Sequence, residues 1–97
     1  MILNTINKSD ISSTSLLACL ATMTNEDALL LLEDGVYAAQ SASVLPSMIP
    51  AGVTLHVLQE DLAARGISDR ISPDFIRVDY REFVSLALHC DKIVSWN

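Results

Sequence analysis

Short apolar runs alternate with stretches of helical periodicity along the whole chain. Each run is bracketed by polar or turn-forming residues, a pattern typical of strands that are buried on both faces of a parallel sheet. The leucine-rich run is ambiguous by propensity, since leucine favours helix, but its brevity and its polar flanks favour a strand. We therefore predict strands at residues 2–6, 28–32, 53–58, 75–78 and 93–96.

The segments between these runs predict four helices. The first follows the N-cap candidates Ser12, Ser13 and Thr14 and continues to about Met23. The second opens at residues 36–40, and Pro46, Pro50 and Gly52 mark the loop after it. The residues expected on the apolar face of the first helix are Leu16, Leu17, Leu20 and Met23.

The third and fourth helices carry clearer end signals. Acidic residues at 60–61, a late Arg65 and a stop at Gly66 suit a short helix. Asp79 stands three residues before Glu82, which predicts a capping box at the start of the last helix. The residues spaced to form the buried side of that helix are Tyr80, Phe83, Val84, Ala87 and Leu88.

Strict alternation of strands and helices predicts a single α/β domain over residues 1–97. Its architecture would be three-layer α/β/α, with a five-stranded parallel sheet between helices. The chain is 51% hydrophobic and 19% charged, which excludes a disordered protein. So small a core does not easily hide that much apolar surface, and we therefore expect association with other chains.

Charge and cysteine content narrow the possible functions. The net charge is -6 and no basic patch is visible, so direct binding to nucleic acid is not expected. The two cysteines, Cys19 and Cys90, form no C-x-x-C or Cys/His cluster, so neither a metal nor another cofactor is expected. Isolated cysteines, a start without a signal peptide and the lack of a long apolar run together predict a cytoplasmic protein without a membrane span.

Ligands of such folds bind where strands end, which here means the loops that begin at Asn7, Glu33, Gln59, Asp79 and Asn97. None of these loops is glycine-rich, which disfavours a nucleotide phosphate. A small-molecule site around Asn7, Glu33 and Gln59 remains one hypothesis. The acids Glu33 and Asp34 are able to serve acid/base or metal chemistry. We favour a tight turn instead, in which Gly35 permits the bend and Asp34 caps the next helix.

No residue set predicts a convincing catalytic centre. Cys19 is expected in the middle of a helix without a basic residue within one turn, so a packing role is favoured over a nucleophilic one. His56 is expected to be a core, edge or interface residue. The scattered Arg65 fits a mixed, solvated surface. Trp96 either covers the last strand or anchors an interface.

Ordered sequence blocks along the chain resemble the TusB/DsrH family. They are LLLEDGVYAA at 30–39, EDLAARG at 60–66, VDY-x-x-FV at 78–84 and the terminal Trp96, with a similar start at residues 3–9. The residues that carry the resemblance most specifically are Glu33, Asp34, Gly35, Asp61, Arg65, Gly66, Asp79, Tyr80 and Trp96.

The resemblance implies a DsrE/F/H-like fold and a mainly structural, non-catalytic subunit. It implies a cytoplasmic dimer of heterotrimers with TusC/DsrF-like and TusD/DsrE-like partners. Such a complex relays persulfide sulfur from a TusA-like to a TusE-like carrier, toward 2-thiolation of the tRNA wobble uridine. The main sulfur-carrying cysteine would belong to the TusD/DsrE-like partner. Because Cys19 matches a cysteine of DsrH-like members, the alternative is a DsrH-type subunit for dissimilatory sulfur oxidation, with Cys19 as a persulfide carrier.

Overall fold

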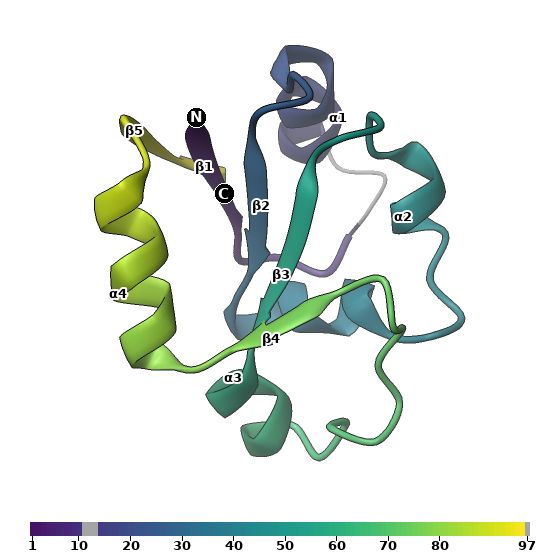
Figure 1. The fold of residues 1–97 in the computed structure, drawn as a ribbon. Coiled ribbons are helices and arrows are strands. Elements are labelled where there is room, and N and C mark those ends of the chain that lie inside the picture. The colour runs from purple at the N-terminus through teal and green to yellow at the C-terminus, as the bar shows by residue number, and fades with distance from the viewer. Residues whose placement is uncertain (11–13, 97) are drawn as a thin grey trace.

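The fold is a single twisted sheet of five parallel strands in the order β4-β3-β2-β1-β5 (Figure 1). The structure is a computed structural model and describes residues 1–10 and 14–96. The predicted five-stranded α/β architecture is confirmed, and every predicted strand is present within about one residue of its expected limits. The strands are β1 (Ile2–Ile6), β2 (Ala28–Leu31), β3 (Thr54–Leu58), β4 (Ile76–Val78) and β5 (Lys92–Trp96).

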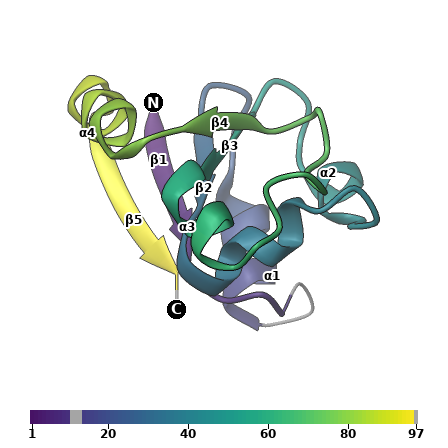
Figure 2. The same cartoon turned by 90° about the horizontal axis from the view of Figure 1, so that it is seen from below.

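The helical segments divide unevenly between the two faces of the sheet (Figure 2). The chain steps outward from β1 to β4 and then crosses back to β5 on the far side of β1. Because such crossovers are right-handed, the segments that connect β1, β2, β3 and β4 lie on one face of the sheet, and the segment that connects β4 to β5 lies on the other. The outward segments are α1 (Thr14–Thr22), the 3-10 helix η1 (Glu33–Ala39), α2 (Leu45–Met48) and α3 (Gln59–Ala64), and the return is α4 (Tyr80–His89).

Two connections differ from the expectation. The helix expected at residues 36–40 is a 3-10 helix that already begins at Glu33. The loop expected around Pro46 contains the short helix α2, in whose first turn a proline ring fits without the loss of a hydrogen bond. The N-cap candidates Ser12 and Ser13, and the strand-end residue Asn97, lie outside the described residues.

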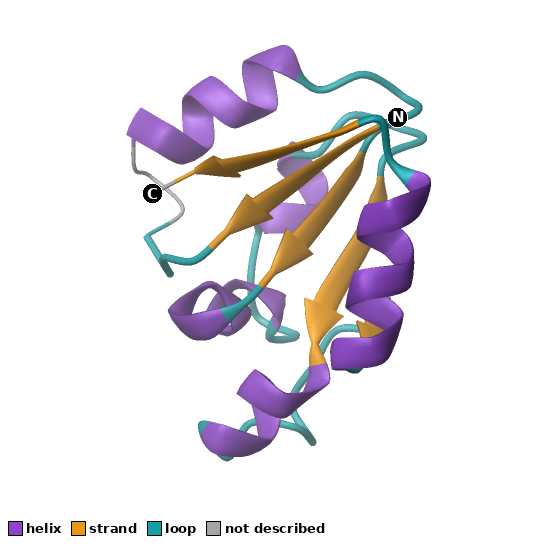
Figure 3. Cartoon of the chain, turned by 90° about the vertical axis from the view of Figure 1, so that its left-hand side faces the viewer, coloured by secondary structure: helices purple, strands orange, loops and turns teal. Residues whose placement is uncertain are grey.

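The core consists of two clusters, one on each face of the sheet. Figure 3 shows helices on both sides of the sheet. Residues alternate between the faces along each strand, so Leu29 and Leu31 enter the larger cluster while Ala28 and Leu30 enter the smaller one. The larger cluster is closed by fully buried side chains from the four helical segments of its face, among them Cys19, Val36, Leu45 and Leu62.

Among the described residues, α4 is the one helix that covers the smaller cluster, and it contains no fully buried residue. Its sheet-facing side consists of the partly buried Phe83, Leu86, Ala87 and Cys90. The expectation that Tyr80, Val84 and Leu88 would be buried is wrong, since all three are exposed. The apolar residues of α4 extend around more of the helix surface than the sheet covers, so those on one flank stay exposed. Likewise, Leu17 of α1 is exposed although it was expected on the buried face of that helix.

Candidate functional site

The residues of two motifs, at 30–39 and 60–66, come together where β2 and β3 end. The Asp61 carboxylate, in the first turn of α3, accepts a hydrogen bond from the backbone N–H of Glu33 at 2.6 Å. The guanidinium of Arg65 lies 2.9 Å from Asp34 Oδ1 and 3.7 Å from Asp61 Oδ1. The two sequence blocks around Gly35 and Gly66 are therefore the two halves of one contact between η1 and α3.

The turn that opens η1 differs from the expected one. The residue in the left-handed region is Glu33, with φ 50°, and not Gly35. Gly35 is required for a different reason, because a Cβ there would lie 2.3 Å from the carbonyl oxygen of Ile6. The expectation that Asp34 caps the helix is also wrong: the N-cap position is Leu32, and no side chain caps it. Asp34 is held by Arg65 instead.

Arg65 is less solvated than the sequence indicates. Its side chain is 23% exposed, and its Nε–H donates to Asp34 Oδ1 at 3.0 Å. Gly66 follows with φ 67° and ends α3, where a glycine tolerates the left-handed conformation. The carboxylates of Asp34 and Asp61 both accept hydrogen bonds or ion pairs from groups of the same chain. These contacts join η1 to α3 at the carboxyl ends of β2 and β3.

The third motif positions α4. The Asp79 carboxylate accepts the Glu82 N–H at 2.7 Å, and the Glu82 carboxylate accepts the Asp79 N–H at 3.1 Å, which confirms the predicted capping box. The backbone N–H of Tyr80 donates to Glu60 Oε2 at 3.0 Å, which ties α4 to the start of α3. The ring of Tyr80 is exposed and lies tilted against Phe83, with the ring centroids 6.3 Å apart.

Trp96 covers the last strand. Its side chain packs against the larger core cluster, and its indole Nε1–H donates to Asn4 Oδ1 at 3.0 Å. Asn4 is itself buried in β1, so this bond joins the first strand to the last.

Cys19 lies fully buried in the larger cluster. Burial raises the pKa of its thiol to about 11, and the negative charge of Asp27 acts in the same direction. A thiol with such a pKa is almost entirely protonated at neutral pH and is a poor nucleophile. Cys90, at the end of α4, is half-buried, and burial also raises the pKa of its thiol.

Two polar atoms near strand residues are buried without a hydrogen-bond partner among the described residues, namely Asn7 Oδ1 and His56 Nδ1. Burial lowers the pKa of His56, whose other ring nitrogen lies 3.1 Å from the hydroxyl of Thr54. Asn7 belongs to the region proposed for a small-molecule site. Glu33, in the same region, is exposed to solvent.

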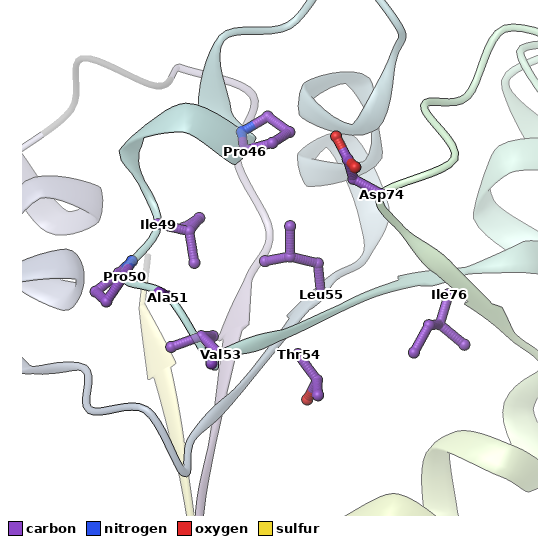
Figure 4. A pocket seen from close by; sticks show the side chains of 10 residues that line it. Pro46, Ile49, Pro50, Ala51, Val53, Thr54, Leu55, Asp74 and Ile76 are labelled. Atoms are coloured by element: carbon purple, nitrogen blue, oxygen red, sulfur yellow. The ribbon is translucent and has the colours of Figure 1, made fainter.

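A cavity of about 440 Å³ lies at the opposite end of the sheet, at the start of β3 and β4 (Figure 4). Ile49, Leu55 and Ile76 line it with apolar side chains, and Asp74 adds a carboxylate. That carboxylate already accepts a hydrogen bond from the Ser72 hydroxyl at 3.2 Å. The cavity is suited to an apolar group, and its lining combines no pair of side chains for acid–base chemistry.

Over residues 1–10 and 14–96, no three His, Cys, Asp or Glu side chains are grouped so as to hold a metal ion. Within the same part of the chain, no helix has the length and apolar character needed to span a membrane.

Comparison of the sequence with known proteins identifies its relatives. Residues 8–93 match the family model described as DsrH like protein. The proteins named TusB from Salmonella arizonae and Salmonella typhimurium are each 41% identical over 86 residues, which covers 88% of this chain and 90% of each relative.

Two solved structures share the fold. The crystal structure of the ychN protein from E. coli superposes with a TM-score of 0.73 at 18% identity and covers 98% of this chain and 97% of its own. The solution structure of protein Tm0979 from Thermotoga maritima gives a TM-score of 0.65 at 25% identity. The superposition covers 91% of this chain and 92% of the Tm0979 chain.

Proposed function

The chain belongs to the DsrH-like protein family, and from this premise we propose that it is a TusB-type subunit of a cytoplasmic sulfur-relay complex. The complex would transfer persulfide sulfur for 2-thiolation of the tRNA wobble uridine. The observation that carries the proposal is the 41% identity to TusB proteins over 88% of the chain. Its partners would be one TusC/DsrF-like and one TusD/DsrE-like subunit, assembled as a dimer of heterotrimers.

The contribution of this subunit is a surface rather than a reacting group. Its motif acids hold its own backbone and Arg65, and its first cysteine lies in the core. The persulfide would therefore travel on a cysteine of the TusD/DsrE-like partner, between TusA-like and TusE-like carriers. The exposed apolar side chains of α4 supply contact area of the kind that a subunit interface needs.

The alternative branch makes Cys19 a persulfide carrier in dissimilatory sulfur oxidation. Its burial and its pKa of about 11 weigh against this role, because sulfur transfer requires an accessible thiolate. Gene neighbourhood separates the branches. Adjacent TusC- and TusD-like genes alone would support tRNA thiolation, whereas adjacent sulfite-reductase genes would support the alternative.

Deletion of the gene tests the proposal. We expect 2-thiouridine at the tRNA wobble position, measured by mass spectrometry of digested nucleosides, to fall to background. The wild-type gene and Cys19→Ala are both expected to restore it, since Cys19 acts only in packing. Unchanged thiolation in the deletion strain would contradict the proposal. A folded Cys19→Ala protein that fails to restore thiolation would favour Cys19 as a carrier.

Co-purification is the biochemical counterpart. A tagged copy of the chain, co-expressed with its TusC-like and TusD-like neighbours, is expected to bring down both in equal amounts. Recovery of the tagged chain without either partner would count against the proposed complex.

A further inference from the structure

The cavity at the start of β3 and β4 lies at the edge of the sheet opposite the contact between η1 and α3. Its volume of about 440 Å³ falls within the range of about 300–1,000 Å³ that is typical of small-molecule sites. Figure 4 shows residues 46–53 along one side, Asp74 and Ile76 along the other, and Leu55 between them. We call it the β3–β4 cavity. It is separate from the region around Asn7, which lies where strands end.

The wall formed by residues 46–53 has little freedom to move. The rings of Pro46 and Pro50 restrict the backbone on either side of the turn. The carbonyls of these prolines accept hydrogen bonds from the N–H groups of Ile49 at 3.4 Å and Val53 at 3.3 Å. Both donor residues line the cavity. A wall that is already ordered costs little conformational entropy when a ligand binds.

Asp74 is the one charged side chain among the described residues that line the β3–β4 cavity. The Ser72 hydroxyl holds its position, since it donates to Asp74 Oδ2 at 3.2 Å and accepts from the Asp74 N–H at 3.2 Å. Ser72 is itself buried. Within the described parts of the chain, no cationic group forms an ion pair with Asp74. The cavity therefore presents a positioned negative charge that no group of the chain neutralises.

Most of the remaining lining is apolar. Leu55 and Ile76 contribute from the strands, and Ile76 keeps 53% of its surface exposed. Apolar surface around a single carboxylate is complementary to a hydrocarbon body with one positive charge. A metal ion fits poorly, because one carboxylate supplies too few ligands. Asp74 and the net charge of -6 would repel an anion.

We propose that the β3–β4 cavity binds a small organic cation with an apolar body, of the class of primary alkylammonium ions. The ammonium group donates to the Asp74 carboxylate, and the hydrocarbon part lies against Ile49, Leu55 and Ile76. This site is independent of the proposed sulfur relay, because none of these residues belongs to the family motifs.

The chain contains its own reporter for occupancy of the cavity. Thr54 lines the cavity, and its hydroxyl oxygen lies 3.1 Å from Nε2 of the buried His56. The imidazole of His56 is therefore one contact away from a bound ligand. The other histidine, His89, ends α4 and does not line the cavity. Its imidazole signal serves as an internal control.

Titration of the isotope-labelled chain with cyclohexylmethylammonium, followed by NMR, tests the proposal. At pH 7 the probe is protonated, and about 0.15 M salt screens its general attraction to an acidic chain. We expect the signals of residues 49–55, residues 74–76 and His56 to shift, while that of His89 does not. Cyclohexylmethanol has the same shape without the charge and is expected to bind about 5-fold more weakly. Cyclohexanecarboxylate is expected not to bind.

Three variants separate the charge from the apolar surface. Asp74→Asn is expected to weaken binding of the ammonium probe about 5-fold and to leave binding of the alcohol unchanged. Asp69→Asn removes another exposed carboxylate, outside the lining, and is expected to change neither. Ile76→Ser is expected to weaken both probes about 3-fold. All three positions are exposed, which favours folding of the variants, and circular dichroism confirms it.

Four results would overturn the proposal. The first is an absence of shifts at the cavity with any probe, and the second is an alcohol that binds as tightly as the ammonium ion. The third is a folded Asp74→Asn variant that binds the ammonium probe like the wild type. The fourth is an Asp69→Asn variant that loses as much affinity as Asp74→Asn, which would mark a general attraction of cations to an acidic surface. The proposed function would stand in each case.

Discussion

The two faces of the sheet differ in how completely they are closed. Four helical segments cover one face, where side chains such as Leu29, Leu31 and Val57 have no exposed surface. One helix covers the other face, and neither α4 nor β5 contains a fully buried residue. Exposed apolar side chains occur on both sides: Tyr80, Val84, Leu88 and Ile93 belong to α4 and β5, whereas Leu17, Tyr37 and Val44 belong to segments of the other face. The closed face accounts for stability, and the open face is available for contact.

The family motifs belong to the framework of this arrangement. Gly35, Asp61 and Arg65 fix η1 and α3 to the ends of the strands, and Asp79 starts α4. Each of these residues has a structural contact that accounts for its place in the chain.

The sharpest contrast is between two leucines. Leu29→Ala, in the closed face, is expected to lower the free energy of unfolding by about 3 kcal/mol, because it leaves a cavity in a fully buried site. Leu88→Ala, in the open face, is expected to change it by about 0.5 kcal/mol or less. Urea unfolding of the purified chain measures both. Equal losses would show that α4 is as much a part of the core as β2.

Glycine substitutions sharpen the same comparison at the ends of the strands. Gly35→Ala is expected to cost about 2–3 kcal/mol, since its Cβ meets the Ile6 carbonyl and the backbone must shift. Gly66→Ala is the control. Apart from its chain neighbours, no atom of the described residues lies within 4 Å of a Cβ at this position, and only the left-handed φ is unfavourable, at about 1 kcal/mol. Thermal unfolding of the two variants side by side gives the difference. A larger loss for Gly66→Ala would refute the packing argument.

The capping box tests how α4 is held on the open face. Asp79→Ala is expected to lower stability by about 1 kcal/mol, because the Glu82 N–H loses its acceptor. Asp79→Ser, which keeps an acceptor at the N-cap, is expected to retain most of that stability. Chemical denaturation followed by circular dichroism compares them. If the two variants are equally unstable, the side-chain cap does not support the helix.

The smallest expected effect is a dependence of stability on pH through His56. Burial lowers its pKa from the ordinary 6.5, so below that pH the unfolded chain binds more protons than the folded chain. Stability is therefore expected to decline as the pH falls below about 6.5. His56→Gln should flatten the urea midpoint between pH 7 and pH 5. A slope identical to that of the wild type would show that other groups cause it.

The strand and helix positions follow from the sequence because each depends on local signals. The apolar run 28–32 and the Asp79–Glu82 pair carry their structure within a few residues. The errors concern contacts between distant residues. The partner of Asp34 is Arg65 on another helix, and the constraint on Gly35 comes from Ile6, so neither is visible in the local pattern. The exposed flank of α4 was missed because periodicity gives the apolar arc of a helix but not the width of sheet available beneath it.

Hydrogen exchange measured by mass spectrometry tests the central comparison directly. The chain in complex with its TusC-like and TusD-like partners is compared with the purified chain alone under the same conditions. We expect residues 80–96 to exchange more slowly in the complex, while the peptides of β2 and α1 exchange equally in both. Equal exchange over residues 80–96, or protection gained instead on the α1 side, would contradict the assignment of the exposed flank of α4 as the contact surface.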